Sequence, residues 1–256
     1  MTGTAVAVVG DGPGADAVVD ALDEEYAVTR RDDPPASTDP VVVVARAGAA
    51  AFDAVDPGAP FVAVELGGVG GHAVGVDAAV GTFEADGVRY GDLRMRVASN
   101  AETDAGTPSP PSPPTARFAG AVAARRLVAL VEDGGVAGTV VELTGSDVGA
   151  TRTVLPVPDA TARDRALRRD WRDVSLDDAL ARAERALDER VGLVREVGER
   201  ESFPAPYYLA ATADTRAFAD ERCAEFAAGV SLDWDVAFVK ALGEGLERYC
   251  AGAYRG

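Results

Sequence analysis

The sequence predicts an α/β fold whose sheet is at least partly parallel. Valine-rich runs almost free of polar residues recur in the first third of the chain, as in "PVVVVAR" at residues 40–46. Such continuous apolar runs are typical of strands that are covered by helices on both faces. Turn residues and short amphipathic stretches separate these runs, and the first run leads into a glycine-rich turn, "GDGPGA". Together these features predict a Rossmann-like N-terminal domain.

The elements expected in this first region alternate between strands and helices. A strand at residues 4–10 precedes a short helix at 15–22, and a long amphipathic helix is expected at 116–132. Further strands are expected at residues 26–31, 40–46, 60–66, 72–80, 138–143 and 152–158.

A proline-rich stretch interrupts this pattern. Residues 101–115 read "AETDAGTPSPPSPPT", with five prolines among Ser, Thr and Gly. Because such a composition cannot pack a core, the stretch is expected to be an extended linker or a surface insertion.

The last third of the chain is expected to form a second domain. A helix is predicted to begin at Ser175, with Asp178 three residues on as an approximate capping box, and to continue through an apolar stripe that reaches Val194. A strand follows at 206–212 and a final helix at 231–249, with Ser231 or Asp233 as its cap. The expected domains are residues 1–160 and 165–256.

The charge balance excludes some partners. The chain has 42 acidic and 25 basic residues, a net charge of −17, and a single lysine, Lys240. An acidic surface argues against nonspecific nucleic-acid binding, which depends on Lys and Arg neutralising phosphates. It is typical of halophilic proteins, which stay hydrated in concentrated salt. No membrane span or signal peptide is evident, so a cytoplasmic location without membrane contact is expected.

Cysteine and histidine offer little chemistry. Cys223 and Cys250 are too few for a disulfide framework and lack the spacing of a metal site. His72, the only histidine, lies in the glycine-rich "GGVGGHAVGVD" and is interpreted as a loop residue. A histidine-based triad is excluded unless it uses His72.

The first glycine turn is compatible with two interpretations. Gly10, Gly12 and Ala15 match the G-x-G-x-x-A pattern that lets a backbone approach a pyrophosphate. Asp32 or Asp33 is loosely placed as the acidic residue at the end of the second strand. A tight strand-to-helix turn is favoured over cofactor binding, and a nucleotide-dependent oxidoreductase stays a weak alternative.

The final helix carries the most informative side chains. At about 100° per residue, Lys240, Glu244, Glu247 and Arg248 fall on the side opposite the apolar face around Leu242. They could be a solvated face with a Lys240–Glu244–Arg248 ion ladder. Alternatively, carboxylates at i and i+3 project side by side and could hold Mg²⁺, which completes its shell with water and phosphates.

The same helix resembles the start of the YcaO domain family, whose signature helix ends in A-L-G-E-A-[LI]-E-R-Y. Gly245 stands where the family usually has Ala, and residues 175–212 also look like the opening of that domain. The matching residues are Ala241, Leu242, Gly243, Glu244, Leu246, Glu247, Arg248 and Tyr249.

This resemblance implies an ATP-dependent peptide cyclodehydratase, which activates a backbone amide so that a neighbouring Cys, Ser or Thr forms an azoline; some relatives make thioamides. It implies that Glu244 and Glu247 hold Mg²⁺ against the ATP phosphates and that Arg248 assists. Many members carry a Gly-Lys-Gly turn before the helix. Here that turn is "GVS", residues 229–231, which leaves Ser231 as the candidate phosphate contact.

Residues 1–160 resemble, less specifically, the E1/ThiF-like partner domain that often precedes a YcaO domain and helps to bind the leader of the peptide substrate. Relatives often carry zinc-binding cysteines in this domain. Here Arg89, Asp92, Ala160 and Arg163 stand at those places, so no zinc is expected.

A YcaO domain continues well beyond the signature helix. The resemblance therefore implies the incomplete α+β start of such a domain, a front portion that would need a complementing C-terminal half or a homo-oligomer. The alternative from another class is a non-enzymatic leader-peptide-binding or scaffold module, which would bind peptide without ATP or Mg²⁺.

Overall fold

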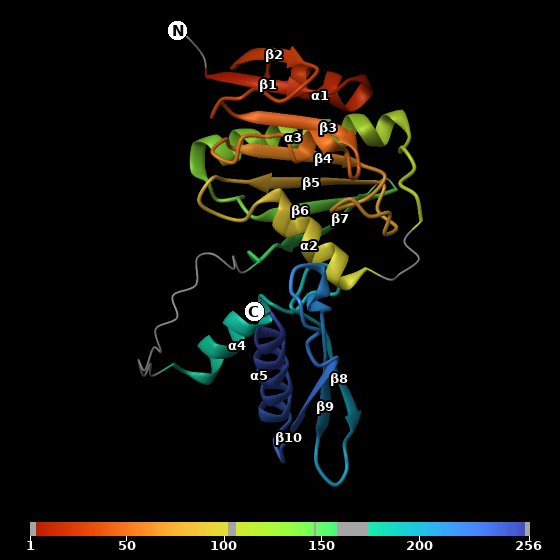
Figure 1. The fold of residues 1–256 in the computed structure, drawn as a ribbon, viewed down its shortest axis with the longest axis vertical. Helices are drawn as coiled ribbons and strands as arrows, with labels where there is room; N and C mark the ends of the chain where they lie inside the picture. The colour runs from red at the N-terminus through yellow and green to blue at the C-terminus, as the bar shows by residue number, and fades with distance from the viewer. Residues whose placement is uncertain (1–3, 102–105, 146, 158–173, 254–256) are drawn as a thin grey trace. The chain divides into compact units, whose positions relative to one another are not determined.

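The structure is a computed structural model that describes residues 4–101, 106–145, 147–157 and 174–253. The chain divides into two compact units, Met1–Pro156 (unit 1) and Val157–Gly256 (unit 2). Unit 1 holds a seven-stranded sheet with helices, and unit 2 holds a three-stranded antiparallel sheet with helices (Figure 1). The predicted α/β class is confirmed.

The sheet of unit 1 is parallel on one side and antiparallel on the other. The first four strands in its spatial order run parallel, and each of the last three runs antiparallel to the strand before it. The prediction of a partly parallel sheet is therefore confirmed. In spatial order the strands are β2 (Ala27–Arg31), β1 (Ala5–Val9), β3 (Val41–Arg46), β4 (Phe61–Leu66), β5 (Ala78–Phe83), β6 (Thr139–Thr144) and β7 (Asp147–Thr153).

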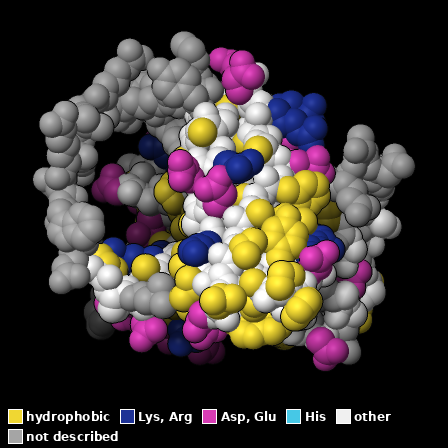
Figure 2. All heavy atoms as spheres, turned by 90° about the horizontal axis from the view of Figure 1, so that it is seen from below, with side chains coloured by type: hydrophobic (Ala, Val, Ile, Leu, Met, Phe, Trp, Pro, Cys, Tyr) yellow, Lys and Arg dark blue, Asp and Glu magenta, His cyan; other side chains and the backbone are white. Residues whose placement is uncertain are grey.

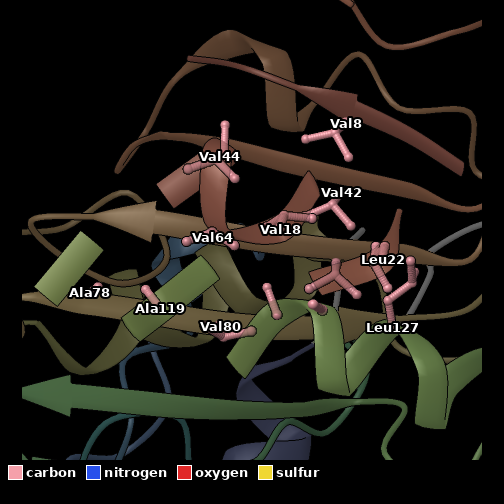
Figure 3. Close-up of a cluster of buried hydrophobic side chains, with 14 of the residues drawn as sticks. Val8, Val18, Leu22, Val42, Val44, Val64, Ala78, Val80, Ala119 and Leu127 are labelled. Carbon is pink, nitrogen blue, oxygen red and sulfur yellow. The ribbon is translucent and has the colours of Figure 1, made fainter. Parts of the chain in front are cut away.

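Two helices cover one face of this sheet, α1 (Gly12–Leu22) and α3 (Pro113–Asp133) (Figure 1). Figure 3 shows Val18 and Leu22 of α1 and Leu127 of α3 packed with valines of the strands. The helix predicted at 116–132 is confirmed as the 21-residue α3. Among the described residues, no helix is both long and apolar enough to cross a membrane.

The other face is covered in part by α2 (Tyr90–Asn100), with the short 3₁₀ turn η1 (Ala50–Phe52) beside it. Tyr90 packs edge-on against Phe61 and Phe83, with ring centroids 6.2 and 5.9 Å apart. Neighbouring residues of a strand point to opposite faces. The valines of β3 are therefore all buried, which explains their unbroken apolar run.

The proline-rich stretch lies within unit 1, where it connects α2 to α3. Gly106 forms an isolated bridge with Ala73, and the backbone of Ser109 lies against Gly67. Gly67 has φ +84°, and a Cβ there would come within 2.2 Å of the Ser109 carbonyl oxygen. The stretch is therefore packed over the end of β4 in this part of its length.

In unit 2 the helix expected from Ser175 is much shorter than predicted. Ser175 caps it as expected, with its Oγ 3.1 Å from the Asp178 N–H, but α4 ends at Glu184 (Leu176–Glu184). Asp188 then accepts bonds from two following backbone N–H groups, at 2.8 and 2.9 Å, and forms a turn. The residues from Val194 on belong to a strand that pairs antiparallel with residues 207–212.

The sheet of unit 2 has α5 (Trp234–Gly252) packed on one face. The core between them contains Val194, Ala210, Ala227 and Leu242, each at most 2% exposed. The strand predicted at 206–212 and the final helix are confirmed, whereas the strands β8 (Val194–Glu201) and β10 (Phe226–Val230) were not predicted. The strands lie in the order β10 (Phe226–Val230), β9 (Tyr207–Thr212) and β8 (Val194–Glu201), and a second 3₁₀ turn, η2, spans Thr215–Ala217.

Candidate functional site

The helix α5 carries the predicted carboxylates and is well specified by its sequence. Asp233, not Ser231, is its N-cap: the Asp233 Oδ1 accepts a bond from the Val236 N–H at 3.0 Å. Asp235 in the first turn complements the helix dipole. Leu242 and Tyr249, at 0% and 1% exposed, anchor the opposite face of the helix in the core.

Two glycines allow α5 to lie close to the sheet. A Cβ on Gly229 of β10 would come within 2.2 Å of the Ala237 carbonyl oxygen, so no other residue fits this contact. A Cβ on Gly245 would lie 3.2 Å from the Ala210 Cβ and 3.3 Å from the Val194 Cγ2. The glycine that replaces the usual alanine of the YcaO pattern therefore faces a tightly packed part of this core.

Glu244 and Glu247 lie on the outer side of α5, as the helical pattern predicts. Glu244 is half-exposed and Glu247 is exposed. The Arg248 Nε donates to the Glu244 Oε1 at 2.8 Å, and the Arg248 Nη1 lies 3.5 Å from the Phe226 carbonyl oxygen. The carboxylates are thus accessible to a ligand, and Glu244 is engaged by an arginine that could also contact phosphate.

The predicted ion ladder is confirmed only for its second half. Glu244 and Arg248 form the i, i+4 pair with their side chains 40% and 46% exposed. Lys240 is directed elsewhere, because its Nζ donates to the Val230 carbonyl oxygen at 3.2 Å. The reason is the closeness of β10, whose backbone acceptors compete for the lysine.

Glu244 and Glu247 can supply only a small number of ligands to a metal ion. Two carboxylates one helical turn apart suit a hard cation that keeps most of its water or phosphate ligands, as Mg²⁺ does. Among the described residues, no three acidic, histidine or cysteine side chains gather into a metal cluster. Glu244 and Glu247 can therefore supply two ligands to Mg²⁺, with the rest coming from outside this helix.

Ser231 lies apart from the carboxylates. It precedes the N-cap of α5, and its Oγ is 3.4 Å from the Asp233 N–H. At about 1.5 Å per residue, α5 separates Asp233 from Glu244 by about 16 Å along its axis. The structure brings Glu244, Glu247 and Arg248 together but leaves Ser231 near the other end of the helix.

The first glycine turn has a structural explanation. Gly10 and Gly12 have φ values of +112° and +79°. A Cβ on Gly10 would lie 2.1 Å from the Val44 carbonyl oxygen, so glycine is needed for β1 to pass close to β3. This geometry accounts for Gly10 by packing alone.

A buried carboxylate in unit 1 was missed by the sequence analysis. Glu65 of β4 is fully buried; its Oε2 accepts from the Gly70 N–H at 2.5 Å, and its Oε1 accepts from the Gly71 N–H and the Tyr90 hydroxyl, each at 2.8 Å. Burial raises the pKa of Glu65, and these donors oppose that shift. Both oxygens are satisfied, so Glu65 holds the glycine-rich loop in place. The feature of the sequence that could have revealed it is an acidic residue inside an otherwise apolar strand.

His72, Arg89 and Asp92 make local backbone contacts in unit 1. His72 pairs with Val69 in a turn of the glycine-rich loop, so the strand predicted from residue 72 begins only at Ala78. Burial, aided by the nearby Arg94, lowers the pKa of His72. Arg89 is the N-cap of α2, and the Asp92 carboxylate accepts from the Arg89 backbone N–H at 2.8 Å. Ala160 and Arg163 lie outside the described residues.

Two solved structures share this fold. A heterocyclase in complex with substrate and cofactor superimposes with a TM-score of 0.64 at 14% sequence identity, over 97% of this chain and 40% of that one. The heterocyclase TruD superimposes with a TM-score of 0.51 at 13% identity, over 76% of this chain and 34% of that one. This chain therefore spans less than half the length of either.

No protein-family model matches the sequence, and no curated protein matches it. At these identities the likeness to the two heterocyclases shows a shared fold. It covers both units of this chain in the first structure, because almost the whole chain is superimposed.

Proposed function

We propose that this chain is the front portion of a YcaO-type, ATP-dependent cyclodehydratase that activates backbone amides of a peptide for azoline or thioamide formation. The observation that carries the proposal is the exposed pair Glu244 and Glu247 on α5, within a chain whose fold is that of heterocyclases. The resemblance of this helix to the YcaO signature assigns the same two residues to Mg²⁺.

The side chains present fit Mg²⁺ with a nucleotide. Mg²⁺ commonly takes one or two protein carboxylates and fills its octahedral shell with water and phosphate oxygens. When bound, Mg·ATP would supply the phosphoryl group that activates the amide oxygen. The role of Glu244 and Glu247 is to hold the metal and so orient the phosphates.

Arg248 would change partners if the metal binds through the Glu244 Oε1. Its Nε donates to that oxygen at 2.8 Å. An exposed pair of this kind is worth only about 0.5 kcal/mol, so a divalent cation can displace the arginine. The freed guanidinium can then donate to a phosphate, as bidentate arginine–phosphate pairs do.

The remaining catalytic groups are proposed to come from outside this chain. The chain covers 40% and 34% of the two heterocyclases. We infer that binding of Mg·ATP can be seen with this chain, whereas turnover of a peptide needs the complementing part of the domain or a second subunit that supplies it. Ser231, near the N-terminus of α5, is proposed as a contact to a part of the nucleotide away from the metal.

Calorimetric titration of Mg·ATP into the chain in molar KCl tests this proposal. The wild type is expected to bind, and a Glu244→Gln/Glu247→Gln variant is expected to lose binding. Glu201→Gln, which changes an exposed carboxylate at the end of β8, is the matched control and should bind as the wild type does. Equal binding by wild type and double variant, or no binding by either, would contradict the assignment.

The non-enzymatic alternative gives a different result in the same experiment. A leader-peptide-binding or scaffold module would bind a precursor peptide equally with and without Mg·ATP. In that case the double variant would keep its affinity for peptide, and α5 would serve only to pack on its sheet.

A further inference from the structure

The strand β10 has a free edge among the described residues, since it pairs only with β9. The Thr212 N–H donates to the Glu225 carbonyl and the Ser231 N–H to the Pro206 carbonyl, so these odd-numbered residues face β9. Backbone groups alternate in direction along an antiparallel strand. The main-chain groups of Phe226, Ala228 and Val230 therefore point away from the sheet.

Three charged side chains of α5 follow this edge. Arg248 reaches the Phe226 carbonyl at 3.5 Å, and Lys240 reaches the Val230 carbonyl at 3.2 Å. Glu244 lies between them on the helix and is paired with Arg248. Four residues of a helix advance about 6 Å along its axis, and two residues of a strand advance about 6.6 Å. The charged side chains, spaced four residues apart on α5, therefore have nearly the same spacing as alternate residues of β10. The order along the edge is positive, negative, positive.

Exposed apolar side chains lie on β10 and on the residues that follow it. Phe226 and Val230 of β10 are 45% and 50% exposed, and Leu232 and Trp234, which follow, are 88% and 46% exposed. Figure 2 shows exposed hydrophobic side chains gathered on one face of the molecule. An exposed apolar group beside a free strand edge is typical of a protein interaction site.

A second copy of this chain is a poor occupant of the edge. Antiparallel pairing of two β10 strands about a two-fold axis at Ala228 would place Lys240 beside Arg248 of the other copy. The same axis would place Glu244 against Glu244. Every close pair would be of like charge, which destabilises an interface.

We propose that the free edge of β10 accepts an extended segment of another polypeptide as an added strand, with apolar residues at alternate positions, acidic residues opposite Lys240 and Arg248, and a neutral polar residue opposite Glu244. The apolar residues would lie beside Phe226 and Val230, and the acidic ones beside Lys240 and Arg248. N–H groups of the added strand would replace Lys240 and Arg248 at the Val230 and Phe226 carbonyls, and the displaced cations would pair with the acidic residues. This inference rests on the proposed function, in which that polypeptide is the part of a heterocyclase that this chain does not cover. Strand addition supplies main-chain hydrogen bonds for affinity and alternate side chains for specificity.

Peptide titration tests the inference. The probe is the hexapeptide Val-Glu-Val-Ser-Val-Glu (the Val–Glu peptide), acetylated and amidated at its ends, and the matched probe is Val-Lys-Val-Ser-Val-Lys (the Val–Lys peptide). The full chain should bind the Val–Glu peptide and bind the Val–Lys peptide at least about tenfold more weakly, and rising KCl should reduce the difference. Lys240→Glu should reverse the preference.

A backbone variant separates strand addition from simple charge attraction. Ala228→Pro removes an N–H that points outward and leaves the bonds to β9 in place, a position where proline is tolerated. Circular dichroism should show an unchanged fold, and binding of the Val–Glu peptide should be lost. Ala228→Ser, which keeps the N–H, should bind as the wild type does.

Three results would overturn the inference. They are binding of neither peptide, equal binding of both, and full binding by a folded Ala228→Pro variant. Elution of the wild type as a dimer that Ala228→Pro converts to a monomer would show that a second copy occupies the edge. These measurements contain no Mg·ATP, so their failure is distinct from failure of the nucleotide titration.

Discussion

Two carboxylates of unit 1 and two of unit 2 differ in their access to solvent. In unit 1, Glu65 and Glu142 are 0% and 4% exposed, and Glu142 lies 3.0 Å from the Arg152 Nε. In unit 2, Glu244 is half-exposed and Glu247 exposed, on the outer side of α5. The same side-chain chemistry therefore has a fixed structural role in one unit and is available to a ligand in the other.

Physical chemistry explains why burial and ligand exchange exclude each other. A buried carboxylate is stable only when its oxygens are hydrogen-bonded or paired, and exchanging such partners costs several kcal/mol. A surface ion pair is worth about 0–1 kcal/mol, so a divalent cation can replace it. Substitutions at the buried carboxylates of unit 1 are therefore expected to change stability most, and substitutions at Glu244 and Glu247 of unit 2 are expected to change ligand binding most.

The largest expected change in stability follows from breaking the buried pair of unit 1. Arg152→Ala removes the guanidinium that lies 3.0 Å from the buried Glu142 carboxylate and is expected to lower the free energy of unfolding by about 3–5 kcal/mol. Urea denaturation measures the loss. The double replacement Glu142→Leu/Arg152→Met is the control and should recover most of it, because two apolar residues leave no buried charge. If Arg152→Ala unfolds at the same urea concentration as the wild type, the Glu142–Arg152 pair does not contribute to stability.

Substitution of Glu65 should give the next largest loss of stability, and this loss should depend on pH. Glu65→Gln leaves one loop N–H facing an amide donor and should cost about 1–3 kcal/mol. Burial raises the pKa of Glu65 in the folded state from 4.5. The folded protein therefore holds this proton more tightly than the unfolded chain, so the Glu65 contribution is greatest below pH 4.5 and falls as the pH rises through the raised pKa.

The measurement is a series of denaturation curves for wild type and Glu65→Gln on both sides of pH 4.5. The difference in free energy of unfolding should shrink as the pH rises. A difference that grows with pH would mean that the hydrogen-bond donors outweigh burial and that the pKa of Glu65 is lowered.

The smallest change in stability is expected in unit 2. Glu244→Gln removes an exposed pair with Arg248 and should change the free energy of unfolding by no more than about 0.5 kcal/mol. The same variant is expected to abolish binding of Mg·ATP. A loss of several kcal/mol would instead show that Glu244 is a structural residue like those of unit 1.

Much of the fold is predictable because the sequence patterns are local. The valine runs of β1, β3 and β4 and the apolar stripe of α3 are readable from residue order alone. The helix from Ser175 was predicted too long, since its apolar spacing continues past the turn that Asp188 forms. The spacing of apolar residues does not reveal a turn made by hydrogen bonds to one side chain. For the same reason the strand that begins at Val194 was not predicted.

The candidate site is predictable only in part for a similar reason. Helical spacing places Glu244, Glu247 and Arg248 on one face of α5, and the structure agrees. The pairing of Lys240 with β10, and the separation of Ser231 from the carboxylates, depend on how the chain folds back after residue 230. Glu65 shows the same limit, because its partners at Gly70, Gly71 and Tyr90 meet only in the folded unit.

The central claim is that Glu244 and Glu247 exchange their surface contacts for a nucleotide-bound cation. Equilibrium dialysis of Mn·ATP against the chain, with Mn²⁺ in place of Mg²⁺, tests it directly when the metal retained with the protein is counted by electron paramagnetic resonance after acidification. The account predicts that the chain retains Mn²⁺ together with ATP, and that Glu244→Gln/Glu247→Gln loses this binding while Glu201→Gln keeps it. Equal retention by wild type and the double variant would contradict it.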